Sequence, residues 1–338
     1  MPTQYILAFE SSCDDTSVAI LDINYNVLVN LISSQPEHLE FGGILPELAS
    51  RLHLKNIVNL TKAALNTSNL NLQDISAIAV SINPGLVGSL IVGLAFAKGM
   101  AWSLSLPLIT VNHILSHIFA NFIEHKVIEP PFLALVVSGG HTELVQFDTL
   151  STFTVVGKTL DDAAGESFDK AAKLLGLGFP GGPAIDELAQ KGNPNFIKFP
   201  RALPQKNNFN FSYSGLKTAI RTWLVNQNPE TLKNKLPDIA ASVQQAIIEP
   251  LVHKTVLWAK QHKIPYILLA GGVAANSALR QQLTDTSGKY GIKVLFPSNT
   301  LCMDNAAMVA AAAIPKYLAG NYSPLSVNVS SLKGTRQV

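Results

Sequence analysis

The sequence is poor in charged residues and in cysteine. Of its 338 residues, 14% are charged and 47% are hydrophobic, whereas charged residues make up about 25% of a usual globular protein. This balance excludes a disordered chain and a polyanion-binding tail, and it supplies the apolar residues for large buried cores. The two cysteines, Cys13 and Cys302, are too few for a disulfide framework or a cysteine-rich zinc knuckle. The cysteine content therefore favours a reducing compartment.

Targeting signals are also missing from the sequence. The stretch Met1–Glu10 is typical of a β-strand and has neither a charged region with an apolar core nor an Arg- and Ser-rich transit segment. Gly85–Val111 contains one charge, Lys98, and is long enough for a membrane span. Because glycines and Pro107 interrupt it, we predict a buried core helix followed by a strand. We expect a soluble, cytoplasmic protein with no membrane partner.

The chain is long enough for about two domains, and its pattern repeats in outline. In each half, three short apolar runs separated by polar turns precede helical patterns and a strand that ends in a glycine turn. The runs are Tyr5–Phe9, Thr16–Leu21, Val27–Ser33 and Ile75–Ile82, then Phe132–Val137, Thr142–Phe147, Phe153–Leu160 and Tyr266–Ala270. The repeated β-β-β-α-β-α order predicts an α/β fold duplicated into two lobes, with a central cleft between them.

We place the boundary between the lobes at Glu129-Pro130-Pro131, which breaks the pattern. Residues 1–128 are expected to form the N-terminal lobe, and residues 129–302 the C-terminal lobe with the nucleotide and substrate site. Residues 303–338 are expected to form a helix, about Asn305–Leu318, and a tail that return to the N-terminal lobe.

Two histidines four residues apart, His113 and His117, are the sharpest local feature. On a helix they lie on one face, so both imidazoles can reach one ion. A zincin protease is disfavoured, because Ile114 stands where the His-Glu-x-x-His motif has its glutamate base. Asp304 is a candidate third ligand, although an aspartate before an alanine-rich helix is also an ordinary N-cap. Two buried histidines bonded to the backbone remain the alternative to a metal site.

Two glycine turns are expected to occupy equivalent places in the two lobes. Ser138–Thr142 is a hairpin turn whose glycines let backbone N–H groups approach an anion. Gly271–Asn276 is a second turn that enters a helix. Each turn alone is also compatible with a plain connection, but together they favour a nucleotide.

Several carboxylates lie near these turns. Asp161 and Asp162 stand where a helix is expected to start, which the helix dipole favours. Asp169 lies one turn before Lys173, so a surface ion pair is the default expectation. Asp186 follows a rigid Gly-Pro turn and has two open interpretations, a ligand for a ribose hydroxyl or a solvated group.

The stretch Leu188–Pro229 contains no acidic residue. Its loop-like part, Gly192–Tyr213, is too long for a simple connection. Its basic residues are Lys191, Lys198, Arg201, Lys206, Lys217 and Arg221, and aromatic residues lie between them. This composition suits a nucleic-acid phosphate backbone with some stacking. A solvated loop followed by an amphipathic helix explains it equally well.

Eight motifs in fixed order resemble those of one protein family over nearly the whole chain. They are Glu10–Asp14, Phe41–Arg51, Asn83–Leu90, Val137–Thr142, Asp161–Lys170, Phe179–Pro183, Ser212–Thr218 and Ala270–Asn276. The family is that of the bacterial tRNA N6-adenosine threonylcarbamoyltransferases, formerly called O-sialoglycoprotein endopeptidases. The resemblance implies a two-lobed, actin-like fold of the ASKHA type.

The activity that the resemblance implies is t6A formation. The family transfers a threonylcarbamoyl group from threonylcarbamoyl-AMP to N6 of the adenosine 3′-adjacent to the anticodon, in tRNAs that read codons beginning with A. The implied partners are tRNA, a paralogous inactive subunit (TsaB-type), a P-loop ATPase (TsaE-type) and the upstream synthase that makes threonylcarbamoyl-AMP. The implied cofactor is one divalent metal ion per subunit, iron(II), with zinc as the alternative.

The resemblance also assigns roles to residues. It implies His113, His117 and Asp304 as metal ligands and Asp14 and Asp15 as an acidic pair that assists catalysis. The implied substrate-binding residues are Val136, Val137, Ser138, Gly139, Gly140, Asp169, Gly182, Asp186 and Asn276. The chain departs from the family pattern at three positions: Asp15 replaces a usual Glu, Asn112 a common His, and Met303 a usual Thr.

We expect acyl transfer without a covalent enzyme intermediate. A metallopeptidase is the first alternative, and it needs a base beside the ligands. An ATP-dependent kinase of the same fold class is the second, and it predicts phosphoryl transfer to a small acceptor. A regulatory nucleotide-binding subunit is the third. The presence of His113 and His117 argues against that role, because the family's inactive paralogue lacks the metal ligands.

Overall fold

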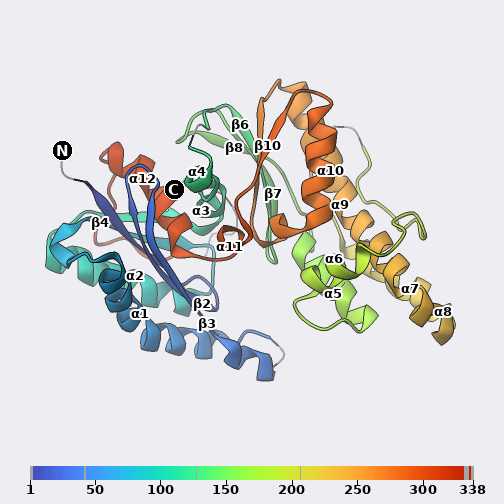
Figure 1. Cartoon of the computed structure of the whole chain (residues 1–338), viewed down its shortest axis with the longest axis horizontal. Helices are drawn as coiled ribbons and strands as arrows, with labels where there is room; N and C mark the ends of the chain where they lie inside the picture. Colours follow the sequence, from blue (N-terminus) through green and yellow to red (C-terminus); the bar gives the residue numbers. More distant parts are fainter. Residues whose placement is uncertain (1–2, 42, 127, 206, 331–334, 336–338) are drawn as a thin grey trace. The chain divides into compact units, whose positions relative to one another are not determined.

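The computed structural model describes residues 3–41, 43–126, 128–205, 207–330 and 335. The chain divides into two compact units, which are described one at a time (Figure 1). Unit 1 consists of Met1–Ile128 and Met303–Val338, and unit 2 of Glu129–Cys302. Part of the predicted C-terminal tail, residues 331–334 and 336–338, lies outside the described residues.

Unit 1 is built on a five-stranded sheet with the strand order β3-β2-β1-β4-β5. The strands are β1 (Tyr5–Glu10), β2 (Asp15–Asp22), β3 (Val27–Ser34), β4 (Ile75–Asn83) and β5 (Leu108–Asn112). The first three pair antiparallel, whereas β4 and β5 run parallel to β1. Strands β1 and β4 are almost wholly buried, as expected of central strands covered on both faces.

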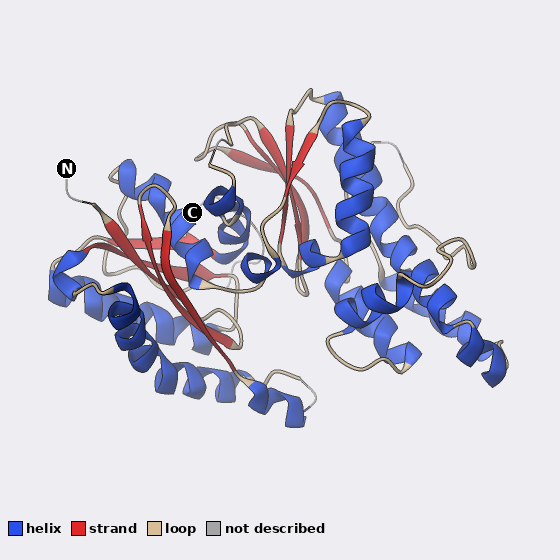
Figure 2. Cartoon of the chain, viewed as in Figure 1, coloured by secondary structure: helices blue, strands red, loops and turns tan. Residues whose placement is uncertain are grey.

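Helices cover both faces of this sheet (Figure 2). They are α1 (Pro46–Ser68), α2 (Val87–Leu104), α3 (His113–Phe119), α4 (Asn121–Glu124) and α12 (Ala306–Leu318), with short 3₁₀ turns at Pro36–Phe41 and Leu72–Asp74. On one face, Ile57 of α1 and Leu94 of α2 join a core with Phe9 of β1. The chain returns from unit 2 to place α12 against β1, β2, β4 and β5.

Helix α2 corresponds to the apolar stretch for which we predicted a buried helix followed by a strand. Both elements are present, but only 33% of α2 is buried. Its buried side includes Leu90, Leu94 and Ala97, while Ile91 and Trp102 are exposed. Among the described residues, α2 alone is long and apolar enough to cross a membrane. One such helix is weak evidence for a span, because core helices of soluble proteins have the same length and composition.

Unit 2 repeats the topology of unit 1. Its strands are β6 (Phe132–Val137), β7 (Thr142–Phe147), β8 (Phe153–Lys158), β9 (Tyr266–Ala270) and β10 (Lys293–Leu295). They lie in the order β10-β9-β6-β7-β8. When this order is written from β8 to β10, the strands β8, β7, β6, β9 and β10 correspond to β3, β2, β1, β4 and β5 of unit 1. Two sheets with the same strand order confirm the predicted duplicated α/β fold.

Unit 2 differs from unit 1 in the longer insertion between its third and fourth strands. Its helices are α5 (Ala164–Leu175), α6 (Gly181–Ala189), α7 (Ser214–Val225), α8 (Pro229–Asn234), α9 (Leu236–Gln261), α10 (Ser277–Gly288) and α11 (Asn299–Cys302), with a 3₁₀ turn at Gly272–Ala275. Phe168 of α5, Ile185 of α6 and Ile247 of α9 meet in its core. The described part of the predicted loop Gly192–Tyr213 contains no helix and no strand beyond a single bridge at Phe211.

Candidate functional site

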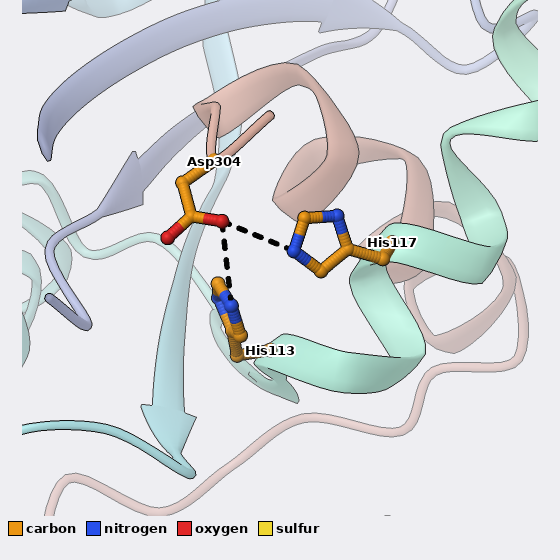
Figure 3. A group of neighbouring side chains, drawn as sticks. All are labelled: His113, His117 and Asp304. Atoms are coloured by element: carbon orange, nitrogen blue, oxygen red, sulfur yellow. Dashed lines mark hydrogen bonds and ion pairs between the residues drawn. The ribbon is translucent and has the colours of Figure 1, made fainter. Parts of the chain in front are cut away.

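The two histidines lie on α3, at the edge of the unit 1 sheet. Strand β5 ends at Asn112, whose side chain accepts a hydrogen bond from the Leu115 N–H at 3.0 Å and so caps α3. The Asn112 amide also donates to the Asn83 side chain at the end of β4, at 3.0 Å. This cap makes His113 the first residue of the helix and places His117 one turn later on the same face (Figure 3).

Asp304 comes to the histidines from the segment before α12 (Figure 3). Its Oδ1 atom lies 3.1 Å from Nε2 of His117 and 3.6 Å from Nε2 of His113. The alternative role as an N-cap is wrong, because the Asn305 side chain caps α12 by accepting from the Met308 N–H at 3.0 Å. The Asp304 carboxylate therefore faces the two imidazoles.

The donor set of this cluster fits a divalent transition metal. One ligand atom from each of His113, His117 and Asp304 lies within 4.8 Å of the others. Both histidines are buried, and Nδ1 of His117 has no hydrogen-bond partner among the described residues. Two imidazoles and one carboxylate are the donor set of non-haem iron(II) sites, and zinc accepts the same ligands.

Behind His113 lies Glu10, a residue to which the sequence analysis gave no role. Its Oε2 atom is 3.1 Å from Nδ1 of His113, and its Oε1 atom accepts from the Ser12 N–H at 2.6 Å. Glu10 is fully buried at the end of β1. A carboxylate in this place fixes the imidazole orientation and turns Nε2 toward Asp304. In the sequence, Glu10 could have been recognised as an acidic residue at the end of an otherwise apolar strand.

The charges of this cluster shift one another's pKa values. Burial by itself would raise the pKa of Glu10, but the charge and hydrogen bond of His113 outweigh it and lower the pKa. Burial would likewise lower the pKa of His113, but the carboxylates of Asp304 and Glu10 raise it to about 9. The two carboxylates thus favour the protonated form of His113.

Replacing Glu10 with glutamine is expected to lower metal affinity by about 10- to 100-fold, because the amide removes the negative charge that orients His113. The measurement is a metal titration against a competing chelator. Glu143→Gln, at a buried glutamate of unit 2, is the matched control and should bind metal like the unchanged protein. Equal affinity in the folded Glu10 variant would contradict this role.

The acidic pair lies where β2 begins: Asp14 is the last residue of the turn after β1, and Asp15 is the first residue of β2. His53 of α1 holds this turn: its Nδ1 atom is 2.7 Å from the Thr16 hydroxyl, and its Nε2 atom donates to the Cys13 carbonyl at 3.0 Å. The sequence does not predict this contact, because nothing in the pattern of α1 distinguishes His53 from a polar surface residue.

The pKa of Asp15 is raised. Burial is the largest cause, a hydrogen bond from Ser34 opposes it, and the charges of Asp14 and Asp304 add to it. A carboxylate with a raised pKa is a stronger base, so Asp15 is suited to accept a proton from a substrate.

In unit 2, the first glycine turn lies directly against the start of α5. The Ser138 N–H donates to the His141 carbonyl at 2.8 Å and closes the turn, with Gly139 and Gly140 at its tip. The Gly165 N–H donates to the Ser138 carbonyl at 3.2 Å, and a Cβ atom at Gly165 would lie only 2.6 Å from that oxygen. The glycine turn is thus held against the N-terminus of α5 by backbone contacts.

The second glycine turn meets the end of β6. Gly271 has φ +87°, and a Cβ atom there would lie 2.5 Å from the Val137 carbonyl oxygen. Asn276 caps α10 by accepting from the Leu279 N–H at 2.9 Å, and its amide donates to Gln244 at 2.8 Å. Val136 and Val137 are fully buried in β6, which is paired with β7 and β9. Both glycine turns belong to unit 2, so the expectation of one turn in each lobe is wrong.

Asp169 and Asp186 connect these turns through α6. Asp169 accepts from the Gly181 N–H at 2.8 Å, next to Gly182 at the start of α6. Asp186 accepts from the N–H and the hydroxyl of Ser277 at 2.9 and 2.8 Å, beside Asn276. Asp169 and Asp186 thus each bind the sequence neighbour of another predicted substrate-binding residue, Gly181 beside Gly182 and Ser277 beside Asn276. Their binding role stays a prediction.

The expected ion pair between Asp169 and Lys173 is wrong. Among the described residues, Lys173 forms no ion pair, and the neighbouring Lys170 binds Asp162 at 2.6 Å and Glu166 at 2.9 Å instead. Burial raises the pKa of Asp169, although its hydrogen bond from Gly181 lowers it.

Asp161 stabilises a helix other than the one predicted. It accepts from the Tyr213 N–H at 2.7 Å and from the Ser214 hydroxyl at 2.8 Å, and so caps α7 rather than α5. Partial burial would raise its pKa, but these hydrogen bonds and one from Ser212 outweigh it and lower the pKa. The segment that leads into α5 thereby fixes the start of α7.

The duplicated sheets and the His-His-Asp cluster define a two-unit α/β protein of the actin-like ASKHA class. The family model of tRNA N6-adenosine threonylcarbamoyltransferase matches residues 26–311. Curated enzymes of that name are similar over almost their whole length: one from Clostridium perfringens (strain SM101) is 50% identical over 97% of both chains, and one from Moorella thermoacetica is 48% identical over 96% of this chain and 95% of its own.

The chain belongs to the tRNA N6-adenosine threonylcarbamoyltransferase family. It is therefore a transferase with tRNA as a substrate, and its threonylcarbamoyl transfer is a t6A modification. A nucleotide-bound crystal structure of full-length HypF shares the fold, with a TM-score of 0.64 at 15% identity over 95% of this chain and 47% of that one.

Proposed function

We propose that this chain transfers the threonylcarbamoyl group from threonylcarbamoyl-AMP to N6 of the adenosine 3′-adjacent to the anticodon, in tRNAs that read codons beginning with A. The observation that carries the proposal is the His113, His117 and Asp304 cluster, supported by Glu10, in a chain of this family. We assign the metal and the acidic pair to residues 1–128 and 303–338, and the donor-binding residues to residues 129–302.

His113, His117 and Asp304 would hold the divalent ion, which we propose to be iron(II), with zinc as the alternative. Bound there, the ion supplies Lewis-acid chemistry for the acyl group of the donor. The protein contributes ligands whose orientation is already fixed by other contacts within the chain. Glu10 fixes the His113 ring, and the Asn305 cap leaves the Asp304 carboxylate directed at the imidazoles.

The donor is proposed to bind unit 2 at the two glycine turns. The backbone N–H groups of Ser138–Gly140 and the N-terminus of α5 suit the phosphate of an adenylate. Ribose hydroxyls are proposed to donate hydrogen bonds to side-chain oxygens near the starts of α6 and α10. These oxygens belong to Asp169, which binds the start of α6, Asp186 in α6, and Asn276, the cap of α10. Each carboxylate oxygen has more than one lone pair, so Asp186 can bind Ser277 and a ribose together.

Transfer is proposed to occur without a covalent enzyme intermediate. The N6 amine attacks the acyl carbon, the bond between this carbon and the phosphate oxygen breaks, and AMP leaves. The amine must lose a proton, and Asp15 is the acceptor that its raised pKa favours, with Asp14 beside it. Because the adenine amine is a weak nucleophile, much of the acceleration must come from positioning.

The family resemblance supports the finer partner proposals. We propose that the chain works with a paralogous inactive subunit, a P-loop ATPase and the synthase that makes threonylcarbamoyl-AMP. We also propose that it acts in the cytoplasm, where tRNA is modified and where its two cysteines stay reduced.

The function is tested with purified protein, its proposed companions, threonylcarbamoyl-AMP and an unmodified tRNA transcript. We expect t6A, detected by mass spectrometry of the digested tRNA, only when the adenosine next to the anticodon is present. A transcript with guanosine at that position is the control. Phosphoryl transfer or peptide cleavage without any t6A would overturn the proposal in favour of a kinase or a peptidase.

A further inference from the structure

Charge is unevenly distributed along the chain. Leu188–Pro229 holds 6 of the 25 basic residues and none of the 23 acidic ones. The rest of the chain is therefore net acidic, although the whole carries a formal charge of +2. Because the rest of the chain is net acidic, we expect a positively charged surface to form at Leu188–Pro229.

Helix α7 presents part of this charge to solvent. Its inner side is fixed by Leu216 and Ile220, which are buried in the unit 2 core. Lys217 and Arg221 are four residues apart, so they lie on one exposed side of the helix about one turn from each other.

The preceding segment adds two more exposed lysines, Lys191 and Lys198. Within the described part of the chain, none of Lys191, Lys198, Lys217 and Arg221 forms an ion pair or a hydrogen bond through its side chain. We call Lys198, Lys217 and Arg221, which lie on α7 or in the segment packed against it, the basic face. Arg201 is excluded because it binds Glu249 at 2.7 Å. Lys206 lies outside the described residues.

Aromatic packing holds the segment against α7. The Phe196 and Phe199 rings lie 6.3 and 6.5 Å from the Trp223 ring of α7, so Lys198 between them is fixed beside the helix. Phe196 remains 38% exposed. The Nζ atom of Lys235 lies 5.5 Å from the centre of its ring, so a further basic group adjoins the same segment.

The basic face begins close to the proposed donor site. Asp161 caps α7 at Ser214, only one turn before Lys217. Asp161 also lies three residues before Ala164, the first residue of α5, whose N-terminus contacts the Ser138–Gly140 turn. A nucleic acid along α7 would therefore run toward the site where the donor is proposed to bind.

We propose that the basic face of unit 2, formed by Lys198, Lys217 and Arg221, binds the phosphate backbone of the tRNA substrate. This inference rests on the proposed function, in which tRNA is the acceptor. When exposed basic side chains neutralise phosphates, the counterions condensed on the nucleic acid are released, and this release drives non-specific nucleic-acid binding. The face would hold tRNA without reading its sequence, because phosphate contacts carry no base information.

The test compares two double variants that remove the same charge from unit 2. Lys217→Ala/Arg221→Ala lies on the basic face, and Lys289→Ala/Lys293→Ala removes two exposed lysines from α10's end and β10. For the first variant we expect the KM for tRNA to rise on the order of tenfold with kcat nearly unchanged. The slope of log affinity against log salt should fall by about 2, one for each lost phosphate contact.

The control variant should keep the KM and the salt slope of the unchanged protein. If both variants weaken tRNA binding equally, the effect is one of general charge and the basic face is overturned. If neither variant changes KM or slope while the unchanged protein forms t6A, the docking proposal fails and the proposed function stands. Absence of t6A from the unchanged protein would instead remove the function on which the docking proposal rests.

Discussion

Replacing His117 with alanine is expected to remove the bound metal and to lower t6A formation by at least about 100-fold. His117 contributes one of three ligand atoms in the cluster, and its Nε2 atom lies 3.1 Å from Asp304. Loss of Lewis-acid stabilisation costs several kcal/mol of transition-state energy, and each 1.4 kcal/mol is about tenfold in rate. Metal content by elemental analysis and t6A by mass spectrometry measure the two effects.

The control for this variant is His253→Ala, which removes an exposed histidine from α9 in unit 2 and should retain both metal and activity. Because His117 is buried, the melting temperature of the variant must also be measured, so that unfolding is not mistaken for metal loss. A folded His117 variant without metal but with full turnover would refute the role of the ion in catalysis.

Replacing Gly165 with alanine is expected to raise the KM for threonylcarbamoyl-AMP by about 100-fold. A Cβ atom at this position would lie 2.6 Å from the Ser138 carbonyl oxygen and 2.8 Å from the Gly139 Cα atom. Both neighbours are backbone atoms, so the glycine turn itself has to move away from the start of α5. A displacement of about 1 Å at a binding site costs on the order of 100-fold. Steady-state kinetics at varied donor concentration give the result.

Gly215→Ala on α7 is the matched control, because nothing lies within 4 Å of a Cβ atom there. It should leave the donor KM unchanged and increase stability by up to about 1 kcal/mol, since alanine favours a helix over glycine. An unchanged KM in a well-folded Gly165 variant would show that the turn does not hold the donor.

Short-range patterns sufficed for the fold. Predicted strands such as Phe132–Val137 and Tyr266–Ala270 coincide with β6 and β9, because their apolar runs are bounded by clear turn residues. The helix after the second glycine turn is also where the sequence places it: α10 begins at Ser277, and Asn276, the last residue of the predicted turn, is its cap. The duplicated strand order followed from the repeat of these runs.

Contacts between distant residues could not be predicted in this way. Asp161 was expected to favour the helix that follows it, yet it caps α7 more than 50 residues later in the sequence. Glu10 and His53 act through partners 103 and 40 residues away. Each role depends on which elements the fold brings together, and spacing along one element carries no information about that. The His113 and His117 pair was visible because both residues lie on one short helix.

Unit 1 is discontinuous, and this has a consequence for biosynthesis. Helix α12 covers β1, β2, β4 and β5, and its first N–H donates to the Ser17 hydroxyl of β2 at 2.8 Å. Because the ribosome makes this helix after all of Glu129–Cys302, the second unit can complete its core while the first still has a bare sheet face. The nascent first unit also lacks Asp304 until then, so the proposed metal site is complete only once translation is nearly finished.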